Sequence, residues 1–78
     1  MTVQAYILVQ TEVGKAAEVA TAISGIEGVT MAEDVTGPYD VIVRAGAGTV
    51  DELGALVISQ VQAVPGITRT LTCPIVTI

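Results

Sequence analysis

The pattern of hydrophobic and polar positions changes from a period of two to helical spacing within the first fifteen residues. Residues 3–10 alternate between two faces, as a half-buried strand does. Apolar side chains then recur at helical spacing up to Gly25, which is expected to end the helix. Thr11 is the expected N-cap, because its hydroxyl can accept from a free backbone N–H, and the following Glu12 suits the helix dipole.

The second half of the chain repeats this plan. Thr49 and Glu52 have the spacing of a capping box at the start of a second helix. Gly54 inside that helix costs about 1 kcal/mol relative to Ala, which predicts close packing on the sheet. The remaining expected elements are strands at about 29–36, 40–47 and 67–78, a turn at 37–39 and a helix over about 49–64.

This order of elements, β-α-β-β-α-β, predicts an α+β fold of the ferredoxin-like type. Right-handed crossovers give a four-stranded antiparallel sheet with two helices on one face. A chain of 78 residues has room for a single domain spanning 1–78. Because no element is left to cover the other face of the sheet, we expect the domain to dimerise through it.

Composition and charge support association and exclude several classes of partner. Apolar residues make up 51% of the chain and charged residues 14%, which leaves apolar groups on the surface and favours an interface. The net charge is −5, with Lys15, Arg44 and Arg69 as the basic residues, so direct nucleic-acid binding is not expected. No apolar run approaches the roughly 20 residues of a membrane span. A single cysteine, Cys73, and the lack of a secretory signal pattern favour the cytoplasm.

Catalytic, metal and cofactor sites are not expected either. The chain has no His, and Cys73 has no basic neighbour in sequence to activate its thiol. Glu33 and Asp34 point to opposite sides of a strand, so they do not form a carboxylate pair. The glycine-containing segment 46–48 precedes a helix without the Lys of a phosphate loop.

The turn that leads into the third strand is the strongest candidate for ligand binding. Asp40 stands at the junction of turn and strand, and Thr70 and Thr72 share one face of the last strand. A carboxylate, two hydroxyls and the backbone groups of the Gly37 turn suit a zwitterion. The alternative is structural, because Asp often caps a turn through its own backbone and Thr is an ordinary strand residue.

Two segments resemble the Lrp/AsnC family of amino-acid-responsive regulators. Residues 36–44, Thr-Gly-Pro-Tyr-Asp-Val-Ile-Val-Arg, resemble that family's Gly-x-[aromatic]-Asp-[apolar run]-basic segment. Residues 64–67, Val-Pro-Gly-Ile, and the threonines at 70 and 72 resemble its Leu-Pro-Gly-Val turn and Thr-rich final strand. Pro38 stands where the family often has a polar residue. The likeness covers nearly the whole chain but only the family's C-terminal effector domain, so a stand-alone ligand-binding domain without a DNA-binding domain is expected.

The resemblance implies how such a domain works. Family members form homodimers through their sheets, and the dimers assemble into octamers or decamers. An amino acid effector binds in clefts between dimers and modulates transcription, and a stand-alone domain could join a full-length regulator in mixed assemblies. Carried over to this chain, the implied ligand-binding residues are Gly37, Tyr39, Asp40, Thr70 and Thr72.

Two other functions stay open at this point. Dimeric α+β barrel enzymes, such as small monooxygenases and isomerases, share the topology, although the absence of His, Phe and Trp counts against one here. A purely structural oligomerisation module, in which the turn only packs subunits, is the other. Ligand binding separates the sensing domain from the structural module.

Overall fold

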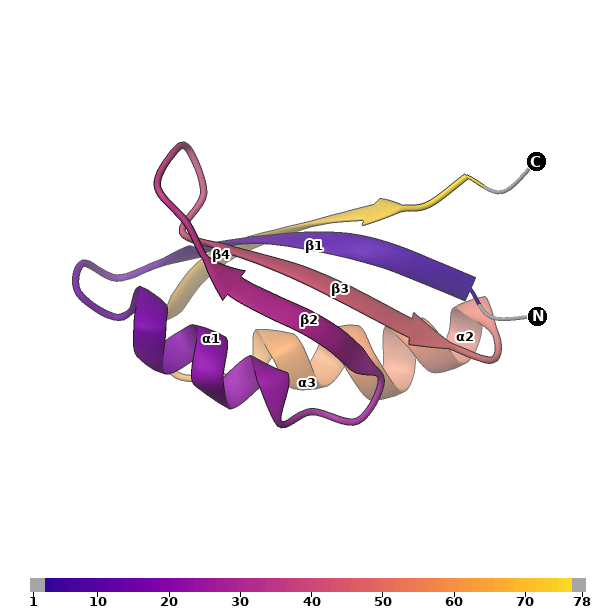
Figure 1. The fold of residues 1–78 in the computed structure, drawn as a ribbon. Helices are drawn as coiled ribbons and strands as arrows, with labels where there is room; N and C mark the ends of the chain where they lie inside the picture. The colour runs from indigo at the N-terminus through magenta and orange to yellow at the C-terminus, as the bar shows by residue number, and fades with distance from the viewer. Residues whose placement is uncertain (1–2, 77–78) are drawn as a thin grey trace.

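The computed structural model describes residues 3–76 and has the predicted ferredoxin-like α+β fold. The four strands form one antiparallel sheet in the order β2-β3-β1-β4, and the helices cover one face of it (Figure 1). Its elements are β1 (Val3–Thr11), α1 (Ala16–Ser24), β2 (Val29–Asp34), β3 (Val41–Ala47), α2 (Val50–Glu52), the π-helix η1 (Leu53–Ile58), α3 (Ser59–Gln62) and β4 (Ile67–Pro74).

The core lies between the sheet and the helices and is built from small and branched aliphatic side chains. Alternate residues of β1 are fully buried, as the period of two predicts. Residues paired across β1 and β3, such as Ile7 with Val43, share this face. The buried set is Ala5, Ile7, Val9, Val19, Ala20, Ile23, Val41, Val43, Ala45, Leu53, Val57 and Val61.

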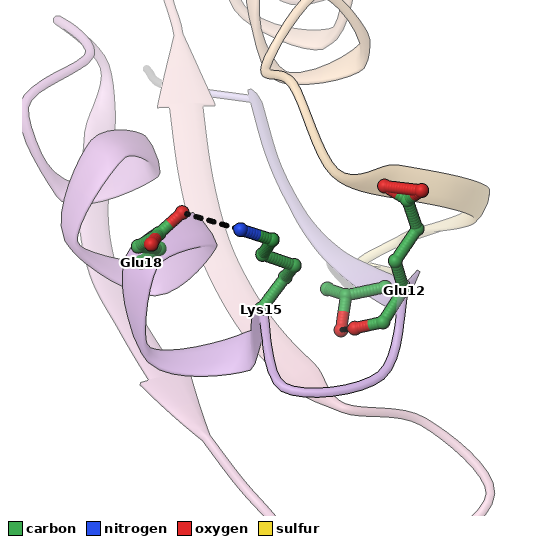
Figure 2. Close-up of polar contacts among 4 residues, drawn as sticks. Glu12, Lys15 and Glu18 are labelled. Carbon is green, nitrogen blue, oxygen red and sulfur yellow. Dashed lines mark hydrogen bonds and ion pairs between the residues drawn. The ribbon is translucent and has the colours of Figure 1, made fainter.

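The first helix begins later than the sequence pattern predicted. Thr11 belongs to β1, where it pairs with Ile67 of β4, so it does not cap the helix. The residue before α1 is Lys15, which makes no side-chain cap. Its ammonium lies 3.7 Å from the Glu18 carboxylate, and Figure 2 shows Lys15 turned toward Glu18 and away from Glu12. The helix ends before Gly25, as expected.

The second helical stretch starts where it was predicted and then changes from α-helical to π-helical geometry. The Thr49 hydroxyl accepts a hydrogen bond from the Glu52 backbone N–H at 3.1 Å, which confirms the N-cap. The next six residues form η1, a rare π-helical turn. Gly54 lies in η1, and a Cβ added there would meet nothing within 4 Å. The prediction that Gly54 packs closely on the sheet is therefore wrong.

Close packing of the helix on the sheet occurs at Gly28 instead. Gly28 has a φ of +96°, and a Cβ built on it would lie 2.7 Å from Val57 Cγ2 and 2.9 Å from the Gly46 carbonyl oxygen. The backbone N–H of Gly46 donates to the Gly28 carbonyl at 2.8 Å. A residue without a side chain is thus required where β2 begins.

The strands that flank the candidate turn are slightly shorter than predicted. β2 ends at Asp34, β3 begins at Val41, and residues 35–40 form the connecting loop. The predicted last strand ends at Pro74 in the structure, and the Ile75 N–H that follows still donates to the Gln4 carbonyl at 2.9 Å. Residues 77 and 78 of that prediction lie outside the described residues.

Candidate functional site

The loop of residues 35–40 is held at its base by the sheet and projects beyond it. The Val35 N–H donates to the Asp40 carbonyl at 2.9 Å, and the Asp40 N–H donates to the Val9 carbonyl at 2.9 Å. Gly37 has a φ of +150° and open space around it. Figure 1 shows this loop rising from the sheet on the side away from the helices. The tip of the loop therefore lies in the open, away from the core of its own chain.

Asp40 anchors the base of this loop with its side chain. Its Oδ2 accepts a hydrogen bond from the Thr11 backbone N–H at 2.8 Å in a partly buried position. The Gln10 side-chain amide donates to the Pro38 carbonyl at 3.0 Å and ties the loop to β1 a second time. The carboxylate thus has a structural role, and among residues 3–76 no donor is found for its other oxygen.

The two threonines of β4 lie on the helix-covered face of the sheet. Thr70 pairs with Val9 and Thr72 pairs with Ile7, and both of these β1 residues are fully buried. The Thr70 hydroxyl accepts a hydrogen bond from the Gln62 side-chain amide at 3.1 Å. The threonines share one face, as the sequence predicted, and both remain partly exposed.

The single chain does not bring the loop and the threonines into one cavity. Asp40 hydrogen-bonds the backbone of Val9 from one side, and Thr70 pairs with Val9 from the other. Two strand spacings therefore separate them, which is about 10 Å. A pocket of about 300 Å³ lies at the opposite end of the sheet, and it is lined by Glu27 and Glu52 among others but by none of the five predicted ligand-binding residues.

The face of the sheet opposite the helices has no covering element among residues 3–76. We call it the open face. Tyr6 is 37% exposed and Leu71 is 43% exposed on it. Strand alternation and pairing assign to the open face the side chains of Gln4, Tyr6, Leu8, Gln10, Met31, Glu33, Ile42, Arg44, Arg69, Leu71 and Cys73.

A polar cluster that sequence reasoning missed lies at the middle of the open face. Arg44 Nη1 donates to the Tyr6 hydroxyl at 2.9 Å, and Nη2 donates to Gln4 Oε1 at 2.5 Å. The guanidinium carbon is also 5.4 Å from the centroid of the Tyr6 ring. Nothing in the sequence signals this cluster, because its members are about 40 residues apart and meet only through the pairing of β1 with β3.

Features of catalytic and metal sites are sparse in the described residues. No group of three or more His, Cys, Asp or Glu side chains within 3–76 is arranged to hold a metal ion. Cys73 is a free, exposed thiol on β4. Between residues 3 and 76 there is no helix with the length and apolar character to span a membrane.

The fold and the loop together define a class, a ferredoxin-like α+β domain whose candidate site is carried by a hairpin loop. The sequence matches the family model described as the Lrp/AsnC ligand binding domain over residues 4–77, and the chain belongs to this family. No curated protein matches the chain by sequence.

Solved structures share this fold closely. TTHA0845 from Thermus thermophilus is 25% identical, with a TM-score of 0.88 over 97% of this chain and 95% of its own. The hypothetical protein PHS023 from Pyrococcus horikoshii is 30% identical, with a TM-score of 0.87 over 99% of this chain and 92% of its own. The transcriptional regulator NMB0573 from Neisseria meningitidis, solved as a complex with L-Met, is 18% identical. Its TM-score is 0.80 over 96% of this chain and 50% of its own, so this chain spans about half of that protein and the likeness shows the fold alone.

Proposed function

We propose that this chain is a non-enzymatic sensing domain that binds a small ligand of the amino acid class and modulates transcription through its state of assembly. Membership of the Lrp/AsnC ligand-binding family over residues 4–77 is the observation that carries the proposal. The L-Met complex of the structurally similar regulator NMB0573 favours an amino acid as the ligand class. We expect the domain to act in the cytoplasm.

The open face is the proposed interface between two copies of the chain. It carries apolar side chains such as Leu8 and Leu71, and burial of such groups drives association. Arg44, Arg69 and Glu33 give this face a charge of +1 within a chain of net charge −5. Every other surface together carries −6, so pairing through the open faces keeps the acidic surfaces of the two copies apart.

The proposed ligand site is completed by assembly of these dimers into an octamer or decamer. The loop tip with Gly37 and Tyr39 projects from the sheet, and Asp40 has an oxygen without a donor among residues 3–76. That carboxylate suits the ammonium group of an amino acid. Because Thr70 and Thr72 lie about two strand spacings away on the other face, the ligand would meet the loop and the threonines from different subunits.

The proposed mechanism is a shift between assembly states. A ligand that binds only when a cleft between dimers is formed favours that assembly by its differential affinity. Mixed assembly with a full-length regulator of the same family would pass this signal to DNA-bound protein. The alternative of a purely structural oligomerisation module differs in one respect, because it binds no effector.

Calorimetry against the twenty amino acids, with light scattering in parallel, tests this function. We expect at least one amino acid to bind and to change the mean mass of the assembly. Thr72→Val and Tyr39→Phe should weaken binding, because each removes one hydroxyl with little change of shape and neither hydroxyl makes a hydrogen bond within residues 3–76. Thr68→Val, at an exposed position of β4, is the matched control. Lack of binding by every amino acid at millimolar concentration would contradict the sensing function, and unchanged binding by both site variants would contradict the site.

A further inference from the structure

Arg44 lies at the geometric centre of the open face. It is the middle residue of β3, and it pairs with Tyr6 of β1. β3 and β1 are the two inner strands of the sheet. One of the three basic residues of an acidic chain therefore occupies the middle of the surface proposed for dimerisation.

The guanidinium is held in place but its charge is not neutralised. Its partners, the Tyr6 hydroxyl and the Gln4 amide oxygen, are both neutral. Among residues 3–76 Arg44 forms no ion pair. The acidic side chain of the open face, Glu33, pairs with Ile42, which places its backbone diagonally from Arg44 at about 7–8 Å. The cluster is thus a fixed cation that has no counter-ion within the described part of the chain, residues 3–76.

Pairing of two open faces brings this cation against its own copy. A two-fold axis that stacks two sheets face to face lies in the plane of the interface, and it maps a residue at the centre of one face close to the same residue of the other. Stacked sheets are about 10 Å apart, so the two Arg44 side chains extend into one shared space. Two like charges taken out of water there oppose association unless a negative charge joins them.

We infer that the dimer binds a small inorganic oxyanion, of the phosphate or sulfate class, between its two Arg44 side chains. A guanidinium offers paired N–H donors that match an oxyanion. The Tyr6 oxygen accepts from Arg44, so its own hydrogen is free to donate to the anion. Two copies supply two positive charges and two hydroxyl donors. This site rests on the proposed pairing through the open face and is distinct from the effector cleft between dimers.

Such a site makes dimer strength depend on anion concentration. An anion that binds the dimer and not the monomer raises the apparent association constant by 1 + [L]/Kd, which is about elevenfold at ten times Kd. General salting-out by these anions also strengthens apolar association. That general effect does not depend on Arg44, so variants of this residue separate the two contributions.

The dimer dissociation constant, measured by analytical ultracentrifugation at constant ionic strength while phosphate replaces chloride, tests the site. We expect phosphate at millimolar concentration to tighten the wild-type dimer about tenfold in a saturable way. Arg44→Gln should lose this dependence on phosphate. Arg44→Lys should keep a weaker dependence, because lysine retains the positive charge but lacks the paired N–H donors of a guanidinium. Arg69→Gln, which removes a basic residue from the edge strand β4 of the same face, should respond as wild type does.

The outcomes distinguish this inference from the proposed dimer. A wild-type dimer that is indifferent to phosphate, or an Arg44→Gln dimer that responds equally, would overturn the anion site and leave the dimer standing. A chain that stays monomeric in every buffer would overturn the pairing itself. If Glu33→Gln weakens the dimer in phosphate-free buffer as much as Arg44→Gln does, the partner's carboxylate is the counter-ion and the anion site is wrong.

Discussion

Replacement of Asp40 by Ala should destabilise the domain even without any ligand. The variant removes the acceptor of the Thr11 N–H, a bond of 2.8 Å in a partly buried position. Hydrogen bonds to charged groups contribute about 1.5–3 kcal/mol, and water can reach this site and replace part of that. We therefore expect a loss of about 1–2 kcal/mol in the free energy of unfolding. For a domain of this size the loss corresponds to a fall in Tm of about 4–16 °C.

Urea unfolding at matched protein concentration measures this loss. Asp34→Ala is the control, because it removes the same charge from an exposed strand position near the same loop, and it should change stability by less than about 0.5 kcal/mol. Asp40→Asn keeps an oxygen acceptor and should retain most of the stability. If Asp40→Ala unfolds at the same urea concentration as Asp34→Ala, the hydrogen bond does not stabilise the fold and the anchoring role is wrong.

Three further changes test the packing and capping by urea unfolding. Gly28→Ala forces a methyl group to within 2.7 Å of a core side chain at a φ of +96° and should cost about 2–5 kcal/mol, whereas Gly14→Ala, with open space at a φ of +81°, should cost about 1–2 kcal/mol. Ile7→Ala empties a fully buried position and should cost about 2–5 kcal/mol, whereas Val13→Ala at a fully exposed position should change stability by less than about 0.5 kcal/mol. Thr49→Ala removes the hydroxyl that caps the second helical stretch and should cost about 0.5–2 kcal/mol.

Sequence patterns were least reliable where a tertiary contact competes with a local preference. Thr11 followed by Glu12 is a good local signal for a helix start, yet β1 continues to Thr11 because Asp40 and β4 both hold it there. Val13, which precedes the helix in the structure, lies in the turn between β1 and α1 and is fully exposed. A capping rule based on neighbouring residues cannot take account of Asp40 and Ile67, which are 29 and 56 residues away from Thr11 in sequence.

The candidate site likewise combines features that the local sequence pattern predicts with a feature that only the strand order decides. The turn before β3, the acidic residue at its end and the shared face of the two threonines follow from local pattern and the period of two. Their separation by β1 does not, because it depends on the strand order β2-β3-β1-β4. That order supports a site completed by more than one chain, and the five residues stay a prediction until ligand binding is measured.

By itself, the sequence determined the order of the elements and the buried faces of the strands. Hydrophobic periodicity and turn residues carry this information locally, and 78 residues allow few ways to arrange it. Only the tertiary structure decided that Asp40 anchors its own loop and that the second helical stretch packs closely against Gly28 rather than through Gly54. It also brought Arg44 together with Tyr6 and Gln4 at the centre of the open face. The physical reason is register, because which side chains meet across paired strands depends on long-range hydrogen bonds that no local pattern encodes.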